Sequence, residues 1–258
     1  MIYVKLLSSL LSVDLYRSIF SLRFFLSVFG VALVMFLTTF KVLSNPSDVL
    51  NLLEMGIGGS GSLILIVCIL PIFPYGTVYA TEWEEQATSF WIVRTGIRNY
   101  SLCKILSTAL TGFLTVAIGL LLFILIMLIN VPLFTHSTTG NAYETLLLEG
   151  EPVKYLFYFI AHYSFTGALF AVTALWVSTF VPNKFVAVAT PLVLSFVAQL
   201  ITSILDIPQY LTITTIVQGV YNVGTPATSL MVKMLTVAVL CLIMGFGAFR
   251  QIRRRAWA

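Results

Sequence analysis

The strongest constraint on the fold of this chain is a series of long apolar runs separated by charged segments. The six runs cover residues 24–43, 60–80, 105–129, 155–180, 185–205 and 228–249. A helix needs about 20 apolar residues to cross the hydrocarbon core of a bilayer. Only 9% of the residues are charged, against about 25% in ordinary soluble domains. We therefore expect one all-α integral membrane domain over residues 1–258, with six transmembrane helices.

The distribution of lysine and arginine predicts the orientation of these helices. If the N-terminus lies inside, eleven of the 14 basic residues fall in cytoplasmic segments, and three, Lys41, Lys154 and Lys233, fall outside. Because basic residues favour the cytoplasmic side, we expect both termini in the cytoplasm and a multi-pass protein of a bacterial plasma membrane. The net charge of +4 is then explained by the excess of basic residues in the cytoplasmic segments. We expect contacts with membrane lipids and none with nucleic acid.

The first 23 residues are too polar to cross a membrane. Lys5, Ser8, Ser9 and Ser12 fall on one helical face, and Asp14, Arg17, Ser18 and Ser21 form a second polar face, rotated from the first. This pattern predicts an interfacial amphipathic helix with a break or turn near Val13. A frayed tail is the alternative.

Three features predict irregular or close packing within the membrane domain. Pro71 and Pro74 predict a kink in the second span. In the third span, Thr108, Gly112, Thr115 and Gly119 form a small-residue face suited to close helix packing. The segment 206–227 between the last two spans carries almost no charge, which favours a re-entrant hairpin. Extension of the flanking spans is the alternative for that segment.

Motifs for chemistry are missing from the sequence. The glycine cluster at 56–61 lacks the lysine of a phosphate-binding loop, so any ATP-driven work requires another polypeptide. Three scattered cysteines and two histidines give no metal-ligand spacing. We therefore expect no catalytic residue, cofactor or metal in this chain.

The loop between the second and third spans, residues 82–104, has a distinct order of side chains. Acidic residues come first, aromatic residues follow, and basic residues come last. Acids at the start of a helix and bases at its end suit the helix dipole. Trp83, Phe90 and Trp91 would allow such a helix to lie at the membrane surface or to insert into a groove of a partner, and the spacing leaves both open.

This loop resembles the corresponding loop of ABC-2 type permeases, the transmembrane subunits of ABC transporters. The matching residues are Glu82, Glu84, Thr88, Arg94, Arg98, Tyr100 and Lys104. Ala87 stands where glycine is usual, and Thr95-Gly96 replaces a common proline. The resemblance extends to the layout of an N-terminal interfacial helix, six spans and two cytoplasmic ends.

The resemblance implies a function as well as a fold. Residues 82–104, including Trp83, would form the coupling helix that receives an ABC ATPase subunit, and that subunit would bind ATP and Mg. A second copy of the chain, or a homologous permease, would complete an exporter working by alternating access. The permease itself would be non-catalytic. Its apolar composition suits a peptide, lipid or drug as cargo, and peptide export is our preferred expectation.

Polar side chains in the spans are candidates for the translocation path. Ser195, Gln199 and Thr202 recur at helical spacing in the fifth span, a helix that contributes to the route in ABC-2 permeases. Tyr75 and Tyr79 follow the predicted kink. Ordinary hydrogen bonding between helices explains such a stripe equally well.

The alternative function is a rhomboid-like intramembrane serine protease. Gly58-Gly59-Ser60-Gly61 fits the nucleophile pattern of that family, and His162 lies two spans later. The sequence departs from the pattern because Gly167 follows the histidine by five residues instead of three. A non-catalytic membrane scaffold is a third possibility.

Overall fold

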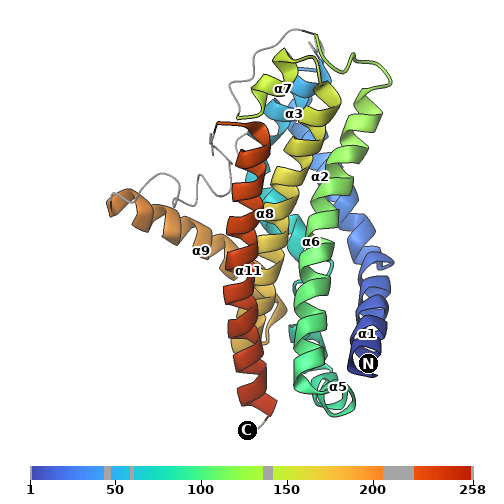
Figure 1. Ribbon diagram of the computed structural model, residues 1–258, viewed down its shortest axis with the longest axis vertical. Coiled ribbons are helices and arrows are strands. Elements are labelled where there is room, and N and C mark those ends of the chain that lie inside the picture. Colours follow the sequence, from blue (N-terminus) through green and yellow to red (C-terminus); the bar gives the residue numbers. More distant parts are fainter. Residues whose placement is uncertain (1, 44–47, 59–60, 136–141, 206–223, 257–258) are drawn as a thin grey trace.

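A computed structural model describes residues 2–43, 48–58, 61–135, 142–205 and 224–256 (Figure 1). These residues form helices and connecting loops without β-strands. Within these described ranges, five helices are long and apolar enough to cross a membrane. They are α2 (Leu22–Thr39), α6 (Ile97–Met127), α8 (Pro152–Phe180), α9 (Lys184–Ile204) and α11 (Pro226–Ala256). The chain is therefore a helical membrane protein, as predicted from its apolar runs.

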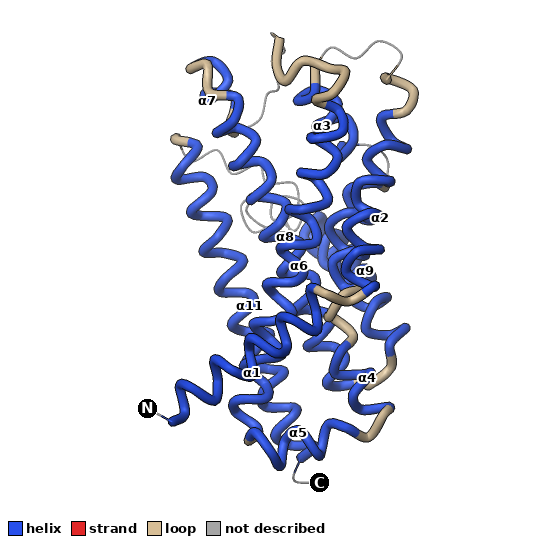
Figure 2. Tube along the Cα trace, turned by 90° about the vertical axis from the view of Figure 1, so that its right-hand side faces the viewer, coloured by secondary structure: helices blue, strands red, loops and turns tan. Residues whose placement is uncertain are grey.

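The long helices form a bundle with two different ends. Helices α6 and α8 pack together at its centre, and α2 and α11 pack against them. The short helices α3 (Val49–Gly58) and α7 (Glu144–Leu148) lie at one end, called the α3 end (Figure 1). Helices α4 (Val78–Glu84) and α5 (Ala87–Thr95) lie at the opposite end, near the C-terminus, which is called the α5 end (Figure 2).

The predicted second span is not one regular helix. Residues Ile64–Ile69 form a π-helix, Leu70–Ile72 form a 3-10 turn, and α4 begins only at Val78. Pro71 and Pro74 lack the N–H group that a continuous helix needs, so the helical hydrogen-bond ladder stops there. This broken segment joins α3 at one end of the bundle to α4 at the other (Figure 2). The predicted kink is confirmed, and the break is larger than a kink.

The N-terminal helix corrects one expectation. Helix α1 runs without interruption over Ile2–Ile19, so the predicted break near Val13 is wrong. The chain turns instead at Phe20 and Ser21, where the Ser21 hydroxyl accepts a hydrogen bond from the Phe24 amide at 3.2 Å and caps α2. Helix α1 packs mainly against α6. The two polar faces therefore belong to one helix, and part of its polar surface faces protein.

Small residues set the distance between the two central helices. A Cβ atom on Gly112 of α6 would lie 2.7 Å from the Ala171 Cβ and 2.9 Å from the Gly167 carbonyl oxygen of α8. Thr108 and Thr115 of the same helix are fully buried. Gly119 approaches α2 in the same way, with Val31 2.5 Å from where its Cβ would lie. The predicted packing role of this small-residue face is confirmed.

Helix α9 differs from the other long helices because it leaves the bundle sideways (Figure 1). Only 12% of the apolar stretch from Lys184 to Ile201 is buried. Most of the predicted re-entrant segment, residues 206–223, lies outside the described residues. Helix α11 then runs through the basic residues of the C-terminus, whose charges lie in its last turn and complement its dipole.

Candidate functional site

The predicted coupling loop folds into the two short helices of the α5 end. Gln86 separates α4 from α5 in the left-handed region, with φ of 57°. Gly96, with φ of 80°, lies between α5 and α6, and glycine takes this conformation without the steric cost of a side chain. The two turns orient α4, α5 and the start of α6 separately. We call Val78–Thr95 the α4–α5 segment.

A buried ion cluster anchors this segment to the bundle. The Lys104 ammonium of α6 donates hydrogen bonds to Glu82 Oε1 at 2.7 Å, Asp14 Oδ1 at 3.1 Å and Tyr75 Oη at 3.0 Å. Three acceptors match the three protons of the ammonium group. The Tyr100 hydroxyl donates to Glu82 Oε2 at 2.6 Å. One cluster therefore joins α1, α4 and α6 to the turn before α4.

The cluster is balanced in charge. Two carboxylates, Asp14 and Glu82, face Lys104 and the Arg17 guanidinium, which lies 3.7 Å from Glu82 Oε1. The Glu82 side chain is 1% exposed and that of Lys104 is 5% exposed. Buried charges cost several kcal/mol each in lost solvation, so such a group is stable only when its members pair. Asp14 and Arg17 were absent from the predicted site, although both lie on a polar face of the N-terminal helix.

The predicted coupling residues divide into two sets. Glu82, Thr88, Tyr100 and Lys104 are buried, whereas Trp83, Glu84, Arg94 and Arg98 are exposed. The buried set is structural in its contacts, because three of its members belong to the ion cluster. The exposed set shares the surface of the α5 end with Phe90, 61% exposed, and Val93, 87% exposed.

Two further contacts join the α4–α5 segment to the long helices α9 and α11. Glu84 forms an ion pair with Lys184 at the start of α9, with 2.7 Å between Oε2 and Nζ. The Arg255 guanidinium of α11 lies 4.8 Å from the centre of the Trp83 ring and donates a hydrogen bond to the Phe180 carbonyl oxygen at the end of α8. The α4–α5 segment therefore makes ionic or cation–π contacts with α6, α9 and α11.

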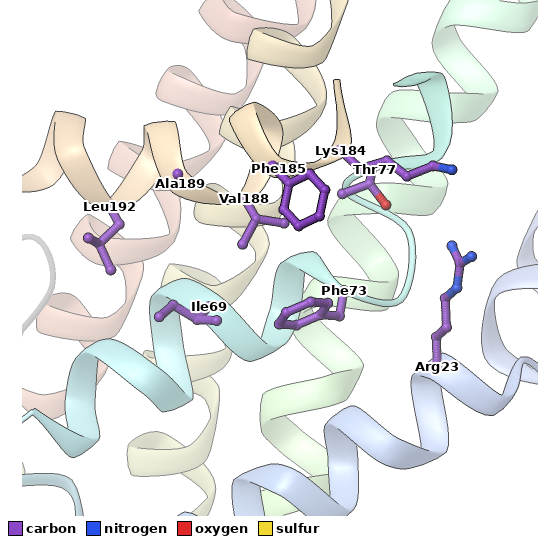
Figure 3. A pocket seen from close by; sticks show the side chains of 9 residues that line it. All are labelled: Arg23, Ile69, Phe73, Thr77, Lys184, Phe185, Val188, Ala189 and Leu192. Atoms are coloured by element: carbon purple, nitrogen blue, oxygen red, sulfur yellow. The ribbon is translucent and has the colours of Figure 1, made fainter. Parts of the chain in front are cut away.

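An apolar groove lies beside these contacts. It has a volume of about 540 Å³ and lies between the start of α2, the broken helix and the first turns of α9 (Figure 3). Its lining residues are Arg23, Ile69, Phe73, Thr77, Lys184, Phe185, Val188, Ala189 and Leu192. The groove shares Lys184 with the ion pair to the α4–α5 segment.

The residues proposed for a translocation path come from two separate places in the chain, the region around the start of α4 and helix α9. Tyr75 and Tyr79 are buried, and Tyr75 belongs to the ion cluster. On α9, Ser195 is half-buried and bonds back to the Leu192 carbonyl at 2.7 Å, while Gln199 is exposed. The side chain of Thr202 lies outside the described residues.

The α3 end carries a second group of buried polar atoms. The Tyr143 hydroxyl and His162 Nδ1 lie 3.0 Å apart, and burial raises the pKa of Tyr143 above its usual range. His162 Nε2 and the ammonium of Lys233 on α11 are both buried, and neither has a hydrogen-bond partner among the residues that the structure describes. Ser60, the nucleophile of the protease hypothesis, lies outside the described residues. Lys233, which the count of basic residues assigns to the outer side of the membrane, is buried within α11.

The described residues were compared with metal-site geometry, and the chain was compared with known proteins. Across the described ranges, no group of three histidine, cysteine or acidic side chains is placed to hold a metal ion. Comparisons with protein-family models, with curated proteins and with solved structures gave no match.

Proposed function

We propose that this chain is the transmembrane subunit of an ATP-driven exporter whose ATPase is a separate polypeptide. The observation that carries the proposal is the α4–α5 segment, which combines an exposed apolar face with ionic links to several long helices. A passive membrane protein has no need for both features in one short segment.

The exposed face of the segment suits a protein partner. Phe90 and Val93 are one turn apart on α5, so their side chains point the same way. Trp83, Glu85 and Arg94 are exposed around them. Apolar side chains surrounded by charged ones at the surface are typical of interaction sites. A helix of this kind can fit a groove on the ATPase subunit.

The anchored side of the segment provides a route for motion. ATP binding in the partner would move α5, and the ion cluster would carry that displacement to α1 and α6. The Glu84–Lys184 pair would carry it to α9, which lies outside the bundle and has little packing to hold it in place. Rigid-body shifts of this kind are a common basis of alternating access.

The remaining features of the proposal follow from the sequence. The broken segment from residue 61 to 84 makes the sixth crossing, and both termini lie in the cytoplasm. A second copy, or a homologous permease, covers the exposed surface of α9. The cargo is apolar or amphipathic, with a hydrophobic peptide as the preferred class. ATP and Mg belong to the partner subunit.

The test is purification of the full chain from native membranes in mild detergent, with mass spectrometry and an ATPase assay. We expect an ATPase subunit in near-stoichiometric amount, and at least a ten-fold loss of it in the variant Phe90→Asp. Leu148→Asp, which places the same charge at an exposed apolar position of the α3 end, is the matched control and should retain the subunit. Absence of an ATPase in several detergents, or its retention by Phe90→Asp, would overturn the proposal.

A further inference from the structure

The groove beside α9 has an apolar body and a cationic end. Figure 3 shows the Arg23 guanidinium and the Lys184 ammonium at the same end of the groove, beyond Phe73 and Thr77. Ile69 and Leu192 lie toward the opposite end. Such a lining matches a molecule with an anionic head and an apolar tail.

The two cations have capacity for an anion. Arg23 is exposed and has no ion pair within the described residues. Lys184 pairs only with Glu84 there, and both side chains are about 40% exposed, at 41% and 42%. Exposed pairs of this kind contribute little and exchange partners readily. A phosphate can therefore take Lys184 from Glu84 while receiving two hydrogen bonds from the fork of Arg23.

The position of the groove selects a lipid as the source of that phosphate. Arg23 lies in the first turn of α2, and Lys184 is the first residue of α9. Both helices are apolar enough to cross a membrane, so their starts lie where lipid headgroups meet hydrocarbon. Phe185 at the edge of the groove is 87% exposed. The groove consequently opens to the surroundings of the bundle. Below the headgroup level these surroundings are acyl chains.

We propose that the groove binds one anionic phospholipid from the leaflet at the α5 end. Its phosphate lies between Arg23 and Lys184, and its acyl chains lie along Ile69, Phe73 and Leu192. Binding weakens the Glu84–Lys184 pair and so separates α9 from the α4–α5 segment. The lipid content of the membrane thereby sets how tightly these two elements are linked. This inference depends on the membrane position of the groove and not on the identity of any ATPase.

The experiment uses the delipidated full chain in detergent, with native mass spectrometry to count bound lipid. Phosphatidylglycerol should bind at least ten-fold more tightly than phosphatidylcholine of the same acyl chains. The double variant Arg23→Gln with Lys184→Gln should abolish this preference. Arg253→Gln with Arg254→Gln removes the same charge from exposed positions at the same end, and should leave the preference intact.

Two further variants and the addition of inorganic phosphate distinguish a lipid site from a site for soluble anions. Glu84→Gln frees Lys184, so it should tighten phosphatidylglycerol binding by about two- to five-fold, the range expected for loss of an exposed pair. Val188→Trp fills the groove without changing charge and should weaken binding of that lipid. Equal binding of the two lipids would overturn the proposal. Displacement of the lipid by inorganic phosphate would overturn it too, by showing a site for soluble anions.

Discussion

At the scale of single residues, Lys104 shows how an apolar bundle accommodates a buried cation. Each of its three protons has an oxygen acceptor. The two charged acceptors, Asp14 and Glu82, come from different helices, α1 and α4. The ammonium group therefore specifies how these helices meet α6. The sequence resemblance selected Glu82, Tyr100 and Lys104 as coupling residues and did not predict that they share an ion cluster. It could not find Asp14 as a partner, because 90 residues separate Asp14 from Lys104.

We predict that Lys104→Met strongly destabilises the protein, because it leaves Glu82 and Asp14 facing each other in the interior. Removing one partner of a buried pair typically costs about 3–5 kcal/mol. Lys184→Met, which removes a lysine from the exposed pair with Glu84, should cost no more than about 1 kcal/mol. Thermal unfolding of both purified variants in detergent measures the difference. Equal losses would show that the cluster is not buried in the assembled protein.

A second prediction concerns Lys233, which is fully buried in α11 and has no hydrogen-bond partner in the part of the chain that the structure describes. An uncompensated ammonium at such a site costs several kcal/mol, so Lys233→Met should stabilise the protein by more than about 1 kcal/mol. Lys154→Met changes an exposed lysine of α8 and should leave the unfolding temperature nearly unchanged, as surface substitutions usually do. Unfolding temperatures test both. A loss of stability in Lys233→Met would instead reveal a partner for this lysine in the native membrane.

At the scale of elements, the sequence predicted the long helices better than the short ones. The runs at 105–129 and 155–180 became α6 and α8, because about 20 uninterrupted apolar residues leave few alternatives to a spanning helix. Helix α3 was not predicted. It lies in a predicted outer loop, where Asp48 caps it by accepting from the Asn51 amide at 2.7 Å. A single capping residue in a loop is too weak a signal to predict a ten-residue helix.

The contact between α6 and α8 gives a prediction at this scale. Gly112→Ala places a methyl group 2.9 Å from the Gly167 carbonyl oxygen, and backbone atoms cannot move aside as a side chain can. Overpacking of this kind costs about 1–3 kcal/mol. Gly58→Ala is the control, because no neighbouring atom of the described residues lies within 4 Å of the added Cβ, and alanine favours helix over glycine. Chemical or thermal unfolding should show a loss for Gly112→Ala alone, and equal behaviour would contradict the close approach of these helices.

At the scale of the whole molecule, the two ends of the bundle differ in the charge they carry. The α5 end holds Arg94 and Arg98 at the surface, together with the basic last turn of α11. In the described part of the α3 end, Glu149 is exposed and Glu144 is half-buried. This asymmetry agrees with the counting of basic residues along the sequence. The orientation that this count predicts stays a prediction, and the charge difference between the two ends allows it to be tested.

That polarity leads to a test of orientation in intact cells. Cys68, Cys103 and Cys241 are first replaced by alanine, and single cysteines are then introduced as Glu149→Cys, Arg98→Cys or Leu121→Cys at exposed positions. A membrane-impermeant maleimide should label Glu149→Cys in intact cells and Arg98→Cys only after the cells are opened, because basic loops stay in the cytoplasm. Leu121→Cys, whose native side chain is exposed within the apolar run of α6, should resist labelling in both states because lipid surrounds it. Labelling of Arg98→Cys in intact cells would show that the orientation is the opposite of the predicted one. The α4–α5 segment would then lie where no cytosolic ATPase could reach it.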